Sequence, residues 1–244
     1  MNMLLNINSS MTEVLSSAYA LRGNFGEIKA IGQVSAQAIL TKFEPCLPSK
    51  FTEFDKAGRG DALRWDLYGY CDLEEVAVIQ VRHTFKRYRR GYTNQHKDYV
   101  LCGSNEVTKA PFRHPVASAV VRAAVNKAPE SPTASVRAAQ RWLWQVTDQQ
   151  LSQSVRQGDV LVVPHKGKPG GVRFDGQTYL IGESHEIHAE QIIIAADLRV
   201  FAWSPLLIHK KGQHAPVKMD KEGWYAVRLA QTAVSWDWSQ RLGD

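Results

Sequence analysis

The order of hydrophobic and polar residues in the first half of the chain predicts a group of strands. Apolar and polar side chains alternate over residues 63–68, which is the period-2 pattern of a strand with one buried face. Residues 76–85 repeat this alternation and are rich in β-branched side chains. A third apolar segment, 99–102, follows a polar stretch, 86–98, that contains glycine and asparagine. We therefore expect a β-hairpin whose arm carries residues 86–98.

The period of the pattern changes in the middle of the chain. Between residues 111 and 159 apolar positions recur every three or four residues, which predicts amphipathic helices. Two of these helices are expected to begin at Pro115 and Pro132, because the fixed φ angle of proline suits the first helical turn. The sequence of residues 147–150, TDQQ, fits a capping box at the start of a third helix, and Gly158 is expected to end it.

From residue 160 onward, short apolar segments return, separated by glycine and proline. Short strands at this spacing are typical of a small barrel or sandwich. The sequence as a whole therefore predicts an α+β protein with three regions. These are a strand-rich region with the basic hairpin arm (1–110), a helical segment (111–159), and a C-terminal small β-barrel or sandwich with a histidine cluster (160–244).

Length and composition place the chain among globular proteins. It has 244 residues, of which 44% are hydrophobic and 22% charged, values close to those of average folded domains. No apolar run approaches the roughly 20 residues that span a bilayer, and the first ten residues lack the pattern of a secretory signal. Cys46, Cys71 and Cys102 are widely spaced and fit buried, reduced thiols. We expect a soluble, cytoplasmic protein with no membrane partner.

The positive charge of the protein is concentrated in the predicted arm. The formal net charge is +6, from 30 basic and 24 acidic residues. No acidic residue lies between Glu75 and Asp98, whereas six Lys and Arg residues do. Without these six, basic and acidic residues are equal in number. A charge that is localised in this way favours one anionic partner over a general effect on solubility.

Aromatic residues among these cations indicate nucleic acid. Lys and Arg contact phosphate groups, and an exposed Tyr stacks on an unpaired base, so the composition fits RNA or a nucleotide. The predicted nucleic-acid-binding residues are Arg82, Lys86, Arg87, Tyr88, Arg89, Arg90, Tyr92 and Lys97. Two alternatives stay open: an acidic protein partner, and a solvated hairpin whose charges serve solubility or pair with acidic residues elsewhere in the fold.

Four of the eight histidines, His185, His188, His209 and His214, lie within 30 residues of one another. Cleavage of RNA through its 2′-hydroxyl needs a base, an acid and a cation near the phosphate. His209 and His214, with Lys211 between them, supply these groups if the loop that joins them folds back. His188 is a further catalytic candidate. The leading hypothesis is therefore a protein that binds RNA or a nucleotide through the arm, with ribonuclease or phosphodiesterase activity of these histidines, without a cofactor, as a candidate further property.

A metal-dependent β-barrel enzyme is the alternative for the same segment. On a strand, the odd separation of positions 185 and 188 puts their side chains on opposite faces, whereas Glu186, His188 and Glu190 share one face. These three residues are candidate ligands of a divalent metal ion, completed by His209 or His214 from a neighbouring strand. Their spacing is not an HExxH or HxH ligand pattern. The metal hypothesis therefore depends on how a second strand packs.

A third hypothesis is a nucleic-acid-binding module without catalysis, in which the histidines are structural. The sequence contains no P-loop, no dinucleotide-binding glycine motif, no hydrolase nucleophile elbow and no kinase motif set. Trp236 and Trp238 alternate with Asp237 near the C-terminus and would share one face of a strand. Exposed tryptophans of this kind are the basis for expecting a homo-oligomer.

Overall fold

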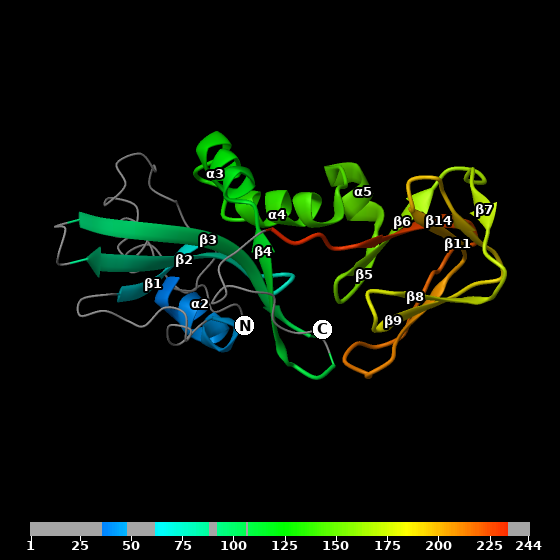
Figure 1. The fold of residues 1–244 in the computed structure, drawn as a ribbon, viewed down its shortest axis with the longest axis horizontal. Helices are drawn as coiled ribbons and strands as arrows, with labels where there is room; N and C mark the ends of the chain where they lie inside the picture. The colour runs from blue at the N-terminus through cyan, green and yellow to red at the C-terminus, as the bar shows by residue number, and fades with distance from the viewer. Residues whose placement is uncertain (1–35, 48–61, 88–91, 106, 234–244) are drawn as a thin grey trace, which may run out of the picture. The chain divides into compact units, whose positions relative to one another are not determined.

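The computed structural model describes residues 36–47, 62–87, 92–105 and 107–233, and it has an α+β architecture (Figure 1). In these residues four α-helices and one short 3₁₀ helix accompany fourteen strands, which form three antiparallel sheets. The predicted fold class is thereby confirmed. The residues divide into two compact units: the first contains the described residues up to Ser104 together with Pro111–Ala139, and the second is formed mainly by Gln140–Gln231.

The first unit contains a four-stranded sheet whose strands neighbour one another in chain order. The strands are β1 (Ala62–Cys71), β2 (Val76–Arg87), β3 (Tyr92–Ser104) and β4 (Pro111–Val116). The helices of this unit are α2 (Ala36–Phe43), η1 (Glu44–Cys46), α3 (Ser118–Lys127) and the first part of α4 (Ala134–Trp144). The predicted hairpin is present, because β2 pairs with β3 from Ala77↔Cys102 to Arg87↔Tyr92. Both strands therefore extend into the basic arm.

One expected helix start is wrong. Pro115 lies in strand β4, opposite Val100 of β3, and helix α3 begins only at Ser118. Proline is tolerated here because β4 is an edge strand, where a missing N–H need not remove a hydrogen bond of the ladder. The residues around Pro115 are buried in this strand. Phe112 and Val116 are thus buried in a sheet rather than on a helix face.

The second unit contains two antiparallel sheets. The six-stranded sheet has the order β5 (Val155–Gln157), β6 (Val160–His165), β14 (Trp224–Leu229), β11 (Val200–Trp203), β10 (Ile192–Ile194) and β7 (Val172–Arg173). The four-stranded sheet has the order β13 (Val217–Lys218), β12 (Leu206–His209), β9 (His185–His188) and β8 (Thr178–Ile181). One buried apolar cluster combines side chains of both sheets, among them Val162 and Ile187. In the described residues no sheet closes into the barrel that was one expected form.

For the third predicted helix, the structure confirms the predicted start and contradicts the predicted end at Gly158. Thr147 Oγ1 accepts from the Gln150 N–H, and Gln150 Oε1 accepts from the Thr147 N–H, so the capping box of helix α5 (Asp148–Gln153) is confirmed. Gly158 does not end this helix. Together with Asp159 it forms the two-residue turn between β5 and β6, with a φ angle of +58°. Glycine adopts this left-handed conformation without the penalty of a Cβ atom.

Cys46, Cys71 and Cys102 are buried and form no disulfide bond. Every helix among the described residues is too short or too polar to cross a lipid bilayer. Trp236 and Trp238, on which the expected homo-oligomer depends, lie outside the described residues. The oligomer therefore stays a prediction.

Candidate metal centre

Three histidines meet beside the four-stranded sheet of the second unit. His185 begins β9 and His209 ends β12, and the antiparallel register makes them direct partners across the two strands. His214 comes from the loop after β12, which turns back at Gly212, whose N–H donates to His209 O at 2.9 Å. The three histidines are 0%, 3% and 4% exposed, in chain order. The loop that joins His209 to His214 thus folds back, and we refer to the three residues as the histidine cluster.

The three imidazole rings lie close to one another. The ring centroids of His185 and His209 are 4.7 Å apart, those of His209 and His214 are 5.0 Å apart, and those of His185 and His214 are 5.9 Å apart. One ring nitrogen of each residue lies within 4.8 Å of the corresponding atoms of the other two. Within the described part of the chain, this is the one group of three His, Cys, Asp or Glu side chains that a single metal ion could contact.

Gly158 allows the rings to approach the turn between β5 and β6. A Cβ atom at this position would lie 2.5 Å from His214 Nε2 and 3.1 Å from His185 Nε2. The first distance is a clash and the second is a tight contact, so any other residue would displace the rings. The two Nε2 atoms therefore both lie next to Gly158, and the absence of a side chain at this residue leaves room for the two rings.

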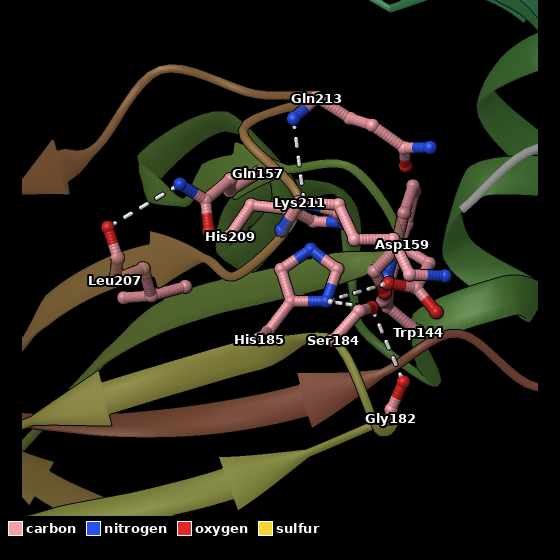
Figure 2. A network of polar contacts seen from close by, with 10 residues as sticks. All are labelled: Trp144, Gln157, Asp159, Gly182, Ser184, His185, Leu207, His209, Lys211 and Gln213. Atoms are coloured by element: carbon pink, nitrogen blue, oxygen red, sulfur yellow. Dashed lines mark hydrogen bonds and ion pairs between the residues drawn. The ribbon is translucent and has the colours of Figure 1, made fainter.

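Asp159 and Ser184 contact the other nitrogen of His185. His185 Nδ1 lies 3.4 Å from Asp159 Oδ1 and 3.2 Å from Ser184 Oγ (Figure 2). The position of Asp159 is fixed, because its main-chain oxygen accepts from the Trp144 indole N–H and from the Ala230 N–H, both at 2.8 Å. A carboxylate placed in this way orients a histidine ring and directs its Nε2 atom toward a ligand.

The loop after β12 holds the ring of His209 through its main chain. The N–H groups of Lys211 and Gln213 donate to His209 Nδ1 at 3.2 Å and 3.4 Å (Figure 2). Lys211, a predicted catalytic residue, is itself exposed at the surface. Its contribution to the histidine cluster is therefore a main-chain hydrogen bond.

Gln157 joins the β5–β6 hairpin to the chain around the histidine cluster. Its side-chain nitrogen donates to the main-chain oxygen of Leu207 at 3.3 Å and to that of Ala215 at 2.7 Å. Leu207 precedes His209 on β12, and Ala215 follows His214. The two bonds therefore fix the turn at Gly158 against both segments that carry these histidines.

The surroundings keep His209 neutral near pH 7. Burial lowers the pKa of His209 below its usual value of about 6.5. The charges of His214 and Lys211 act in the same direction on this pKa, whereas Asp159 acts in the opposite direction. A neutral imidazole is the form that binds a metal ion, and it offers no positive charge to a phosphate. The ring of His209 is therefore better suited to the surroundings of a cation than to direct contact with a phosphate.

Two of the residues predicted as metal ligands, Glu186 and His188, lie on the other face of β9. His188 Nε2 is 3.1 Å from Glu186 Oε2, and Lys210 Nζ is 3.9 Å from Glu186 Oε1. His188 Nδ1 also contacts Thr178 Oγ1 at 3.1 Å. Glu190 follows the end of β9 and is exposed. Glu186 and His188 thus lie together, half-buried, on the face opposite the histidine cluster.

The structure describes part of the predicted nucleic-acid-binding surface. Arg82 is buried and pairs with Asp66 of β1 at 2.8 Å, which removes it from the exposed charges of the arm. Lys97 is exposed on β3. Lys86, Arg87 and Tyr92 lie in the paired strands near the end of the hairpin, and Tyr88, Arg89 and Arg90 lie outside the described residues.

No protein-family model, curated protein or solved structure matches the chain, so the site is interpreted from its own residues. Gly158 and Asp159 are functional residues that the sequence did not predict, because the glycine also fits a helix end. A signal for them was present, because a Gly-Asp pair directly before the apolar segment 160–163 fits a two-residue hairpin turn. His185 was not among the predicted site residues, because the register that pairs it with His209 joins segments distant in sequence.

Proposed function

We propose that the second unit binds a divalent transition metal ion at the histidine cluster. The observation that carries this proposal is the burial of three facing imidazole rings. One nitrogen of each ring lies within 4.8 Å of those of the other two, and histidine nitrogen is a common ligand of such ions. Imidazole nitrogen suits Zn²⁺, Co²⁺, Ni²⁺ and Cu²⁺. The Asp159 carboxylate beside His185 would offset part of the charge of the ion.

The spacing of the ring nitrogens is compatible with a metal ion. Two nitrogens that bind one Zn²⁺ at about 2.1 Å are about 3.4 Å apart in a tetrahedral site. The ring nitrogens of the cluster lie within 4.8 Å of one another. Ring movements of about 1 Å therefore suffice to form the bonds.

Calorimetric titration of the full chain tests the proposal. The protein is treated with EDTA, dialysed and titrated with Zn²⁺, and we expect one ion bound per chain. His185→Ala and His214→Ala should each weaken the affinity by about 100-fold or more, because each removes a nitrogen that faces the ion. A saturating ion should also raise the melting temperature of the wild-type protein, because it binds the folded state.

Two histidines outside the histidine cluster give the controls. His165→Ala removes an exposed histidine of β6 and should leave Zn²⁺ affinity unchanged. His188→Ala tests the outer face of β9. Zn²⁺ binding that is lost with His188→Ala and retained with His185→Ala would place the ion on the outer face and overturn the proposal.

A second candidate function is the binding of RNA or another polyanion by the basic arm. It is favoured by the β2–β3 pairing, which carries Lys86 and Arg87 to the end of a long hairpin (Figure 1), and by the exposure of Lys97. Affinity for a fluorescent single-stranded RNA should fall with rising salt and fall further in a variant with Arg87, Arg89 and Arg90 changed to Ala. Lys42→Ala, which removes an exposed cation of α2, is the control. An affinity that responds equally to both variants would contradict this role of the arm.

Cleavage of RNA by His209 and His214 is the less favoured form of that proposal. The two rings lie together, as such a reaction needs, with centroids 5.0 Å apart. Both residues are nearly fully buried, however, and a phosphodiester must reach the acid and the base directly. RNA cleavage that persists in EDTA and is lost in His214→Ala would restore it.

A further inference from the structure

The Nδ1 atoms of His185 and His209 have opposite hydrogen-bonding surroundings, and this difference sets what each ring presents to the histidine cluster. A neutral imidazole carries one proton, so one nitrogen is a donor and the other an acceptor. A nitrogen that carries the proton cannot coordinate a metal ion. The partner of Nδ1 therefore decides whether Nε2 is a metal ligand or a hydrogen-bond donor.

His185 has its Nδ1 atom next to an acceptor. Ser184 Oγ lies 3.2 Å from Nδ1 and donates its own proton to Gly182 O, so it accepts from the ring, and Asp159 Oδ1 lies 3.4 Å away on the same side. The proton of His185 is therefore on Nδ1, and Nε2 has a lone pair. His185 Nε2 and His214 Nε2 both lie close to Gly158. A Cβ atom at this glycine would be 3.1 Å from the first and 2.5 Å from the second. These two nitrogens therefore lie on the same side of the cluster, beside the turn.

His209 has its Nδ1 atom next to donors. The N–H groups of Lys211 and Gln213 point at it from 3.2 Å and 3.4 Å, and a main-chain N–H cannot accept. Nδ1 therefore uses its lone pair as the acceptor, and the proton of the ring is on Nε2. His209 Nε2 is buried and has no hydrogen-bond partner among the described residues. It is a buried donor that lacks an acceptor, which is costly unless a ligand supplies one.

We infer that His185 and His214 coordinate the metal ion, and that His209 donates a hydrogen bond from Nε2 to a small anion bound at an open position of that ion. This inference rests on the proposed metal site and names its further ligand. Two histidines leave coordination positions of a Zn²⁺ or Co²⁺ ion unfilled, and an anion there is an acceptor for the unpaired N–H. The burial of all three rings limits the anion to a few atoms.

Binding of azide to the Co²⁺-loaded full chain tests the inference, because the visible spectrum of Co²⁺ reports both the metal and its ligands. His209→Ala should keep Co²⁺ affinity within about 10-fold of the wild type and weaken azide binding by about 10-fold or more. His209→Gln, which places an amide N–H near the former Nε2 position, should recover part of the azide affinity. His185→Ala should lose Co²⁺ itself, and His165→Ala should change neither affinity.

The outcomes separate the inference from the proposed function. If the wild-type chain binds no metal ion, the proposed function is wrong. If it binds Co²⁺ and His209→Ala loses this ion as fully as His185→Ala does, His209 is a ligand and only the inference is overturned. Unchanged azide affinity in His209→Ala overturns it as well. Nitrogen-15 spectra of the histidine rings in the Zn²⁺-loaded wild type give an independent measurement, in which His209 Nε2 should remain protonated.

Discussion

Each unit of the protein buries a polar cluster, and the two clusters differ in how their members complement one another. In the first unit, the side chains of Arg82 and Asp66 are 8% and 1% exposed and form an ion pair at 2.8 Å. In the second unit, three imidazole rings of one chemical kind face one another. Arg82 and Asp66 carry opposite charges and pair with each other, whereas the three imidazole rings are of one chemical kind and bring their nitrogens within 4.8 Å of one another.

This difference separates a polar cluster that supports the fold from one that binds a ligand. Removal of one member of a buried ion pair leaves an uncompensated charge, so its cost appears in folding stability. Removal of one member of a ligand site relieves the crowding of like groups, so its cost appears mainly in binding. Changes at the two clusters should therefore be distinguishable by which of these two quantities they alter.

The largest effect on stability should come from the ion pair of the first unit. Arg82→Met leaves Asp66 buried without its cation and should lower the free energy of unfolding by about 3–5 kcal/mol. Urea denaturation measures this change. The double variant with Asp66→Leu should recover most of the loss, because it removes the second charge as well. A cost below about 1 kcal/mol for Arg82→Met would show that the pair does not stabilise the first unit.

The next effect should be the loss of metal binding in Gly158→Ala. The new Cβ atom would lie 2.5 Å from His214 Nε2, and the residue would keep a φ angle of +58°. Gly167→Ala is the matched control, because its φ angle is +71° and nothing lies within 4 Å of its Cβ position. Both variants should lose about 1–2 kcal/mol of unfolding free energy through the left-handed conformation. Only Gly158→Ala should lose the rise in melting temperature that Zn²⁺ causes. Equal responses to Zn²⁺ would contradict the placement of the ion beside Gly158.

A smaller effect should appear in the pH dependence of the metal-free protein. The folded state lowers the pKa of His209, so between the folded pKa and about 6.5 the unfolded chain binds more protons than the folded one. Stability from this residue is therefore complete above about pH 6.5 and is lost as the pH falls from there through the folded pKa. Urea titrations at several pH values should show a shallower decline in His209→Gln than in the wild type. Identical slopes would show that His209 does not contribute.

The smallest effect should come from an exposed ion pair of the first unit. Lys42 Nζ lies 2.6 Å from Glu75 Oε1, and the side chains are 43% and 65% exposed. Lys42→Ala should lower the free energy of unfolding by less than about 1 kcal/mol, because solvent screens both charges. The contrast with Arg82→Met measures how much burial adds to a pair of similar length. Equal losses of unfolding free energy in Lys42→Ala and Arg82→Met would show that burial does not strengthen the pair.

The sequence predicts the parts of the fold that depend on local pattern. The alternation of residues 63–68 and 76–85 anticipates β1 and β2, and the TDQQ sequence anticipates the capping box of α5. Pro115 was misassigned because its tolerance in a strand depends on the position of β4 at a sheet edge. That position is a property of the assembled sheet, which no short window of sequence contains.

The candidate site was predicted in part for the same reason. The separation of His185 and His188 onto opposite faces of a strand follows from spacing alone and agrees with the structure. The meeting of His185 with His209 depends on the register of β9 against β12. The role of Asp159 depends on a hairpin that approaches from the other sheet. Both contacts join segments that are distant along the chain.

The pairing of His185 with His209 also has a consequence for the order of folding. The cluster exists only when β9 has paired with β12, the loop after β12 has turned back, and the β5–β6 turn has docked through Gln157. Contacts between distant segments form late, because the chain must first lose the entropy of the intervening loops. A metal ion held there would close several of these loops at once. Capture of the ion would then be a late folding event and a signal that the second unit has reached its native arrangement.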